Sequence, residues 1–255
     1  MTKFLVFFIA TFFIAVHISA QETRINIRAK AKDAKFIGSS LGGAHIIVRN
    51  KVNGQILAEG KTEGSTGDTK LIMDQLLQRG ESIATPETAK FQAVLDIDEP
   101  TFVEIEVLSP INLKTSQVRA TTELWVIPGK HILNDGIVLE IPGLIIDVLE
   151  PRTHAYISLN SLASQSLPIQ VNVVMMCGCS VESGGLWDAD KMEIKAMVKH
   201  NGKRMDDVTL KFASRNLFEG RIPVTDTGNY EVIVYGYEEH TGNTGLDKVN
   251  YVILD

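Results

Sequence analysis

Apolar and polar residues alternate with a period of two along most of the chain after residue 20. In the stretch 23–32, Ile25 and Ile27 are separated by polar residues, which is typical of a strand with one buried face. Asn53-Gly54 lies between two apolar runs and predicts a hairpin, because both central positions of such a turn need a positive φ. The alternation predicts strands over residues 23–32, 44–50, 55–62, 90–97, 101–109, 121–128 and 136–150.

A second series of predicted strands follows a serine-rich stretch, residues 150–168, which contains Pro151 near its start and ends at Pro168. Many short strands separated by turns favour antiparallel β-sandwiches. We therefore expect an all-β protein with two antiparallel β-sandwich domains, residues 21–150 and 151–255. The exception is 69–80, where helical spacing of apolar residues predicts one short helix that ends at Gly80. The strands of the second series are predicted at 169–176, 191–200, 208–214, 217–224, 228–239 and 248–255.

The first 20 residues have the layout of a secretory signal peptide. Lys3 precedes an apolar run from Phe4 to Val16, and the small residues Ser19 and Ala20 follow it. This run is shorter than the roughly 20 residues that cross a bilayer. We therefore expect cleavage after Ala20 and export to the periplasm or the outside of the cell.

Charge and cysteine content narrow the function classes. The net charge is −6 at pH 7, without basic clusters, which argues against binding to nucleic acid or to anionic membrane surfaces. Cys177 and Cys179 are the only cysteines. An exported chain could use disulfides freely, so two cysteines exclude a disulfide framework.

Residues 42–70, GGAHIIVRNKVNGQILAEGKTEGSTGDTK, resemble the opening of transthyretin-like or carboxypeptidase-regulatory-like modules. The shared features are a strand, a turn with glycine, and a second strand that leads into a loop rich in threonine and glycine. The resemblance implies that the first domain is a transthyretin-like β-sandwich.

The second domain resembles a bacterial immunoglobulin-like module. Asp226, Gly228 and Tyr230 are spaced like the turn that leads into the F strand of that fold. The resemblance implies that Tyr230 is the corner tyrosine, whose hydroxyl bonds back to the backbone. Val232 occupies the position of the second disulfide cysteine of antibody domains, so no disulfide between the sheets is expected. Trp187 precedes the strand 191–200 and is not placed like the core tryptophan of that fold.

Four sulfur-containing residues gather where strand 169–176 ends, namely Met175, Met176, Cys177 and Cys179. Three interpretations stay open. The first is a disulfide between Cys177 and Cys179, with Gly178 permitting the kink. The second is a soft metal site, because thiolate and thioether donors together select Cu(I): Cys177 and Cys179 would bind with Met175 or Met176 as the third donor and His154 as the fourth. The third is a pair of reduced cysteines packed in the core.

Two aspartates, Asp188 and Asp190, lie two residues apart in a loop and form a weak candidate for Ca²⁺ binding. No catalytic residue has a recognisable local motif in the sequence. We therefore expect an exported, non-enzymatic protein that binds a protein or small ligand through its loops, with Cu(I) as the candidate cofactor. The alternatives are a thiol-redox accessory protein that uses Cys177 and Cys179, and a structural or adhesive module pair with a local disulfide.

Overall fold

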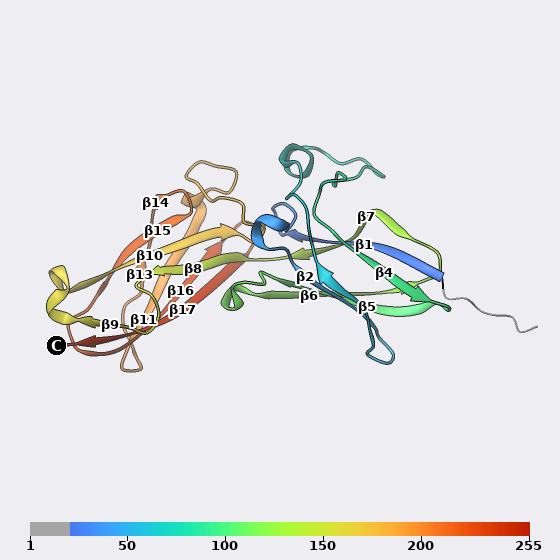
Figure 1. Cartoon of the computed structure of the whole chain (residues 1–255). Helices are drawn as coiled ribbons and strands as arrows, with labels where there is room; N and C mark the ends of the chain where they lie inside the picture. The colour runs from blue at the N-terminus through green and yellow to red at the C-terminus, as the bar shows by residue number, and fades with distance from the viewer. Residues whose placement is uncertain (1–20) are drawn as a thin grey trace, which may run out of the picture.

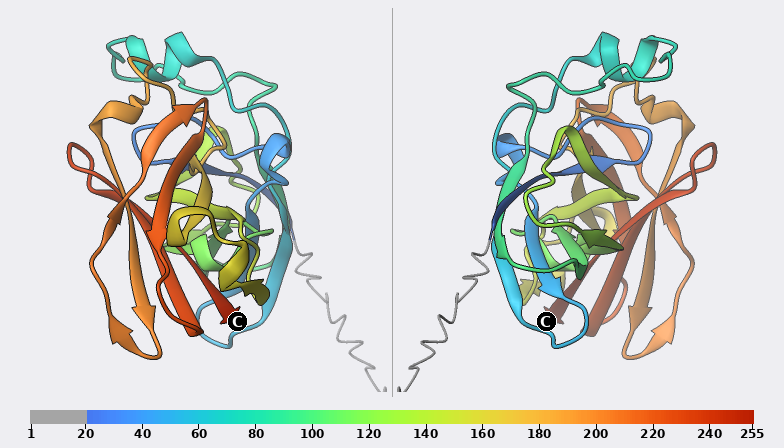
Figure 2. Two further views of the ribbon diagram at one scale, coloured as in Figure 1. Left: turned by 90° about the vertical axis from the view of Figure 1, so that its left-hand side faces the viewer. Right: turned by 90° about the vertical axis from the view of Figure 1, so that its right-hand side faces the viewer.

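A computed structural model describes residues 21–255 of the chain. The expected signal peptide, residues 1–20, lies outside the described residues. Strands dominate the described chain, which confirms the all-β prediction, and they form two β-sandwiches placed end to end (Figure 1). Views along the long axis show the paired layers of each sandwich (Figure 2).

The first sandwich is built from two sheets with strand orders β4-β1-β7 and β3-β2-β5-β6. All of its strand pairs are antiparallel except β1 with β7, which run parallel with Ile27 opposite Ile137. Inward-facing residues such as Ile25, Leu95 and Ile105 are fully buried between the sheets. Its strands are β1 (Gln21–Ala31), β2 (His45–Asn50), β3 (Ile56–Lys61), β4 (Phe91–Ile97), β5 (Thr101–Ser109), β6 (Val118–Val126) and β7 (Ile132–Ile141).

The second sandwich has sheets with strand orders β14-β15-β10-β8 and β12-β11-β16-β17-β9, and β13 pairs with β11. Taken in chain order, the first sheet has the A-B-E-D arrangement of an immunoglobulin fold and the second contains its C-F-G strands. Its strands are β8 (Leu144–Glu150), β9 (Ala155–Ser158), β10 (Ser166–Met175), β11 (Met192–His200), β12 (Lys203–Arg204), β13 (Val208–Thr209), β14 (Lys211–Ser214), β15 (Leu217–Pro223), β16 (Gly228–Glu238) and β17 (Asn243–Leu254).

The corner tyrosine expected from the resemblance is present. The hydroxyl of Tyr230 donates a hydrogen bond of 3.0 Å to the carbonyl oxygen of Asp226, four residues upstream. Val232 is fully buried, so an apolar contact stands where antibody domains carry a disulfide. The immunoglobulin-like assignment of the second sandwich therefore rests on its strand order and on the hydrogen bond between Tyr230 and Asp226.

The change from one sandwich to the other falls at residues 142–143. We expected the boundary at residue 150, but β8 pairs with β10, with Val173 opposite Ile146. The apolar run 136–150 reads as one continuous block in the sequence, and Pro142-Gly143 divides it into the last strand of one sandwich and the first of the next.

The helix expected over 69–80 is reduced to one turn, η2 (Lys70–Asp74), followed by irregular chain. Gln75 is already extended, and the side chain of Leu76 is 96% exposed. Leu76 and Leu77 are exposed, so the apolar residues after the turn have no surface on which a longer helix could pack. The other helical elements are single 3-10 turns, η1 (Ser39–Leu41), η3 (Lys114–Ser116), η4 (Leu159–Ser161), η5 (Ala163–Gln165) and η6 (Ala189–Lys191).

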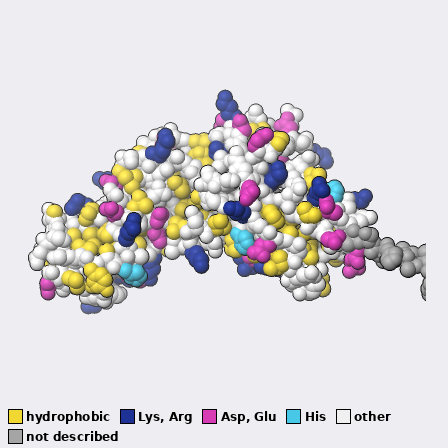
Figure 3. All heavy atoms as spheres, in the orientation of Figure 1, with side chains coloured by type: hydrophobic (Ala, Val, Ile, Leu, Met, Phe, Trp, Pro, Cys, Tyr) yellow, Lys and Arg dark blue, Asp and Glu magenta, His cyan; other side chains and the backbone are white. Residues whose placement is uncertain are grey.

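On the face shown in Figure 3, positive and negative side chains are interspersed over both sandwiches. This face therefore carries no continuous basic stripe. Within residues 21–255, no helix is both long enough and apolar enough to cross a bilayer.

Candidate functional site at the module junction

The cysteine pair lies in a tight turn at the end of β10. Gly178 adopts a φ of +76°, a conformation that favours glycine, and its N–H donates to the carbonyl oxygen of Met175 at 2.7 Å. The N–H of Met175 donates to the carbonyl oxygen of Cys179 at 3.1 Å, which closes the turn. Cys177 and Cys179 are joined by a disulfide, with their Cα atoms 5.4 Å apart. This separation is within the range that a disulfide bridges.

The two cysteines differ in exposure. Cys177 has no exposed surface and belongs to the hydrophobic core, whereas Cys179 is partly exposed. Met175 and Met176 are both buried, and the Cε methyl of Met176 lies against Gly143. The methionines therefore fill the interior next to the module junction, as methionines commonly do.

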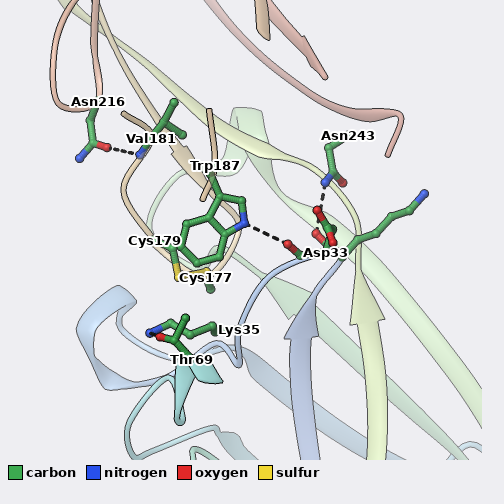
Figure 4. Close-up of a disulfide and its surroundings, with 10 residues drawn as sticks. Asp33, Lys35, Thr69, Cys177, Cys179, Val181, Trp187, Asn216 and Asn243 are labelled. Atoms are coloured by element: carbon green, nitrogen blue, oxygen red, sulfur yellow. Dashed lines mark hydrogen bonds between the residues drawn. A yellow bond between two sulfur atoms is a disulfide. The ribbon is translucent and has the colours of Figure 1, made fainter. Parts of the chain in front are cut away.

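A second loop, residues 182–189, lies beside the disulfide and reaches across to the first sandwich (Figure 4). The indole Nε1 of Trp187 donates a hydrogen bond of 2.9 Å to the carbonyl oxygen of Asp33. The N–H of Glu182 donates to the carbonyl oxygen of Trp187 at 3.1 Å, and this bond holds the loop closed. A side chain from the second module is thus anchored to the backbone of the first.

A cavity of about 490 Å³ lies between the disulfide and the first sandwich. Its lining includes Lys35, Ser40 and Thr66 from the first module and the disulfide, Glu182 and Trp187 from the second. The ammonium of Lys35 donates to Thr69 Oγ1 at 3.2 Å, and Glu182 is paired with Arg215. We call this cavity the junction pocket; it combines a disulfide, an aromatic face and charged groups.

Two further side chains fasten the modules. Asn243, which is fully buried at the start of β17, accepts from the N–H of Gly143 at 2.7 Å and donates to the carbonyl oxygen of Lys32 at 3.2 Å. Ser116 of the first module lies between β8 and β17, with its Oγ 3.2 Å from the N–H of Ile146 and 3.5 Å from the carbonyl oxygen of Leu246. Both contacts satisfy backbone groups that the sheets leave unpaired.

The structure places His154 away from the sulfur-containing residues of the expected soft metal site. Cys177 and Cys179 are adjacent, but Met175 faces the sandwich interior. His154 lies in a different hollow, beside Tyr156 and Asn250. Among residues 21–255, no group of three His, Cys, Asp or Glu side chains is arranged to hold a metal ion. Copper binding stays a prediction.

The two aspartates of the calcium candidate close their own loop. Asp188 Oδ1 accepts from the N–H groups of Gly184 and Asp190, at 2.8 and 3.1 Å. These backbone hydrogen bonds, and the charge of Lys191, lower the pKa of Asp188. Asp190 Oδ2 accepts from the hydroxyl of Ser183 at 2.5 Å. Calcium binding stays a prediction, although both carboxylates already have partners.

Sequence reasoning did not identify Asn243, Ser116 or Asp33 as junction residues. Asn243 lies in a polar stretch, EEHTGN, that reads as an ordinary loop, and Asp33 contributes only its backbone carbonyl. Ser116 lies between two predicted strands, outside any run of alternating apolar residues. Their roles depend on where two sandwiches meet, and no local pattern encodes this.

Comparisons with known proteins give likenesses to solved structures only; no family model and no curated protein matches the chain. The fibronectin(III)-like modules of Clostridium thermocellum CbhA are 10% identical with a TM-score of 0.30, over 91% of this chain and 93% of theirs. The titin Ig tandem domains A164-A165 are 10% identical with a TM-score of 0.26, over 93% and 98%. An engineered protein is 14% identical with a TM-score of 0.32, and the match covers 48% of this chain but only 22% of that one.

Proposed function

We propose that the chain is an exported, non-enzymatic binding protein whose two β-sandwich modules act as one rigid unit and present the junction pocket to a ligand. The observation that carries this proposal is the pocket itself, because both modules line it. A pocket of this kind keeps its shape only when the modules are fixed relative to each other. Preformed, concave sites between domains are common places for ligands.

Three independent contacts support a fixed junction. Asn243 of the second module bonds to the backbone of Gly143 and of Lys32 in the first module. Ser116 of the first module bonds to the backbone of β8 and β17 in the second. Trp187 of the second module donates to the carbonyl oxygen of Asp33 in the first. Asn243 is fully buried, so breaking its bonds leaves buried polar groups unpaired, which costs about 1–3 kcal/mol. Such contacts oppose the free swinging that is usual for modules joined by a short linker.

We further propose that the first module is transthyretin-like or carboxypeptidase-regulatory-like. Residues 42–70, which carry the resemblance, form β2, a turn with Gly54, β3 and the following loop, in the expected order. The sheet β3-β2-β5-β6 joins the second, third, fifth and sixth strands of this module, which is not the A-B-E-D and C-F-G division of an immunoglobulin domain.

The copper hypothesis applies to the reduced protein alone. A disulfide has no thiolate to offer, so the oxidised protein gives Cu(I) only thioether and imidazole donors, which the fold keeps apart. Stoichiometric Cu(I) uptake by the reduced protein, lost in a Cys177→Ser, Cys179→Ser double variant, would support this hypothesis. Elemental analysis of the purified protein checks it directly.

The rigid unit is tested by loosening the junction. Asn243→Ala removes both of its side-chain bonds, and we expect a stability loss of about 2 kcal/mol together with a broader range of inter-module distances. Small-angle X-ray scattering of the folded variant and of the wild type measures the second effect. Asn250→Ala is the matched control, because Asn250 lies on the same strand with an exposed side chain. The proposal would be contradicted if the wild type already showed a broad range of inter-module distances and Asn243→Ala did not broaden it.

Export is tested separately. Expression of the whole chain in a bacterial host with a periplasm should yield a mature protein in the exported fraction that begins at Gln21. N-terminal sequencing or intact mass of the purified protein decides this. A product that keeps residues 1–20 in the cytoplasm would remove the export part of the proposal.

A further inference from the structure

We propose that the Cys177–Cys179 disulfide is a thiol-exchange site, at which a dithiol reductant entering the junction pocket attacks the sulfur of Cys179 and releases Cys177 as the leaving group. This goes beyond ligand binding by a rigid unit and does not depend on it. The exchange needs only that one sulfur can be reached from the pocket. Its readout is a covalent change, so its failure can be distinguished from failure of the binding proposal.

The direction of attack follows from the burial of the two sulfurs. Exchange occurs by displacement at a disulfide sulfur, and access decides which sulfur is attacked. Both cysteines line the junction pocket, but Cys177 has no exposed surface and belongs to the core, whereas Cys179 is partly exposed. Cys179 is therefore the cysteine whose sulfur an incoming thiolate can reach, and Cys177 is the leaving group.

The chemistry balances with a dithiol as the co-reactant. One thiolate of the dithiol bonds to Cys179 Sγ as the bond between the two cysteine sulfurs breaks, and Cys177 leaves as a thiolate that takes up a proton. The second thiolate of the dithiol then attacks the sulfur of its own molecule in the mixed disulfide and releases Cys179, which is protonated in turn. The dithiol is oxidised to a disulfide by two electrons, and the cysteine pair is reduced to two thiols.

Charged groups of the pocket favour the approach of an anion. Lys35 lines the pocket with its ammonium bonded to a neutral hydroxyl, Thr69 Oγ1, so its charge is not neutralised there. The acid in the lining, Glu182, is paired with Arg215. Lys35 therefore brings a positive charge to the pocket lining that can attract an approaching thiolate.

The site also explains the turn at Gly178. With one residue between them, the cysteines close a ring that ties down very little chain, so the disulfide contributes little to stability through chain entropy. Gly178 is exposed and has only Leu41 near the position of a Cβ. Breaking a bond that closes so small a ring costs the folded protein little chain entropy, which suits a bond that is made and broken in the folded state.

The first experiment asks whether the folded protein is reduced. Native wild-type protein is treated with dithiothreitol at pH 7.5 without denaturant, alkylated with iodoacetamide, and analysed by mass spectrometry while circular dichroism monitors the fold. We expect two alkylated cysteines in a protein that keeps its β-sheet spectrum. Reduction that occurs only at the rate of global unfolding would overturn the proposal.

The second experiment tests which sulfur is attacked. The single variants Cys177→Ser and Cys179→Ser each leave one thiol, and both are reacted with 5,5′-dithiobis(2-nitrobenzoate) in the native state. We expect Cys179 in the first variant to react at least about tenfold faster than Cys177 in the second, because access controls the rate. Equal rates, or the reverse order, would refute the assignment of Cys179 as the attacked sulfur.

A third variant tests the pocket in the intact disulfide protein. Lys35→Met removes the cation from the pocket, and we expect reduction by dithiothreitol to slow by about threefold at low ionic strength and less in salt. Lys203→Met, on β12 of the second module and outside the junction pocket, is the charge-matched control. A rate unchanged by Lys35→Met, or slowed equally by both variants, would show that the attack does not pass through the junction pocket.

Discussion

In the first module a buried arginine holds the long loop between β3 and β4 against the sheet, whereas in the second module strand pairing and the Tyr230 corner perform the corresponding task. Arg28 is only 3% exposed and lies on the outward face of β1. Its guanidinium donates to the carbonyl oxygens of Thr88 and Ala89 in the loop and to those of Asn134 and Asp135 in β7. One side chain thus satisfies four backbone acceptors.

In the second module the longest strands pair with each other without such a side chain between them. β16 and β17 pair over their whole length, from Gly228 opposite Ile253 to Glu238 opposite Asn243. The difference shows two ways to satisfy buried backbone groups: by sheet ladders where the chain is regular, and by a charged side chain where it is not. The stability of the first module should therefore depend strongly on Arg28.

The strongest test of this difference is Arg28→Met. The substitution keeps apolar volume but leaves four carbonyl oxygens without their donor, and we expect a loss of about 3–5 kcal/mol. Burial also lowers the pKa of Arg28, and the charge of Asp135 opposes this effect. Equilibrium unfolding in urea, monitored by circular dichroism, measures the loss.

Arg24→Met is the matched control. Arg24 lies on the same face of β1, four residues earlier, but it is half exposed and pairs only with Glu22. Such a surface ion pair contributes at most about 1 kcal/mol. If both variants lost the same stability, the first module would not depend on the buried arginine, and the contrast between the modules would disappear.

A smaller effect is expected from the two buried tyrosines of the second module. Tyr230→Phe removes the hydrogen bond to the carbonyl of Asp226 and should cost about 1–2 kcal/mol. Tyr251→Phe should be neutral or stabilising by up to about 1 kcal/mol, because the Tyr251 hydroxyl is buried without a hydrogen-bond partner in the described chain. Thermal unfolding of both variants gives the comparison.

The pair of tyrosines sharpens the contrast between modules. Both rings are about 99% buried, so the two substitutions differ only in whether the hydroxyl has a partner. A larger loss from Tyr251→Phe than from Tyr230→Phe would show that the corner contact does not support the second sandwich.

The outlines of both modules were predictable because they depend on local pattern. Alternation marked most strands, and the resemblance of residues 226–230 to an immunoglobulin-like turn implied a hydrogen bond of Tyr230 that the structure contains. The prediction of a helix over 69–80 was wrong beyond its first turn because Leu76 and Leu77 have no partner surface, which a periodic pattern does not reveal.

The junction was not predictable in the same way. Asn243 acts through backbone groups of Gly143 and Lys32, which are about 100 and 211 residues away in the sequence. Arg28 reads as an ordinary polar residue on the outer face of a strand, and only the return of the loop over that face buries it. Residues that bond to distant backbone groups have no periodic pattern or motif in the sequence. The cysteine pair could be identified from the sequence because its two members are only two residues apart.

The smallest expected effect concerns acids of the second module and their dependence on pH. Burial, and then the charge of Asp247, raise the pKa of Asp147 on β8. A carboxyl with a raised pKa in the folded state binds its proton more tightly there, so its contribution to stability falls as pH rises from its unfolded pKa, about 4, through its folded pKa. Asp147→Asn should therefore stabilise the protein at neutral pH, and the gain should shrink toward acid pH.

Glu231 in the same module provides the opposite sign. Hydrogen bonds from Lys199 and Lys248 lower its pKa, so it stabilises the fold at neutral pH and this contribution is lost as pH falls through its folded pKa. Glu231→Gln should destabilise at neutral pH and approach the wild type in acid. Urea unfolding of both variants at a series of pH values between about 3 and 7 measures the two trends. The stability difference between variant and wild type should rise with pH for Asp147→Asn and fall with pH for Glu231→Gln. If both differences changed with pH in the same direction, burial would not raise the pKa of Asp147 in the folded second module.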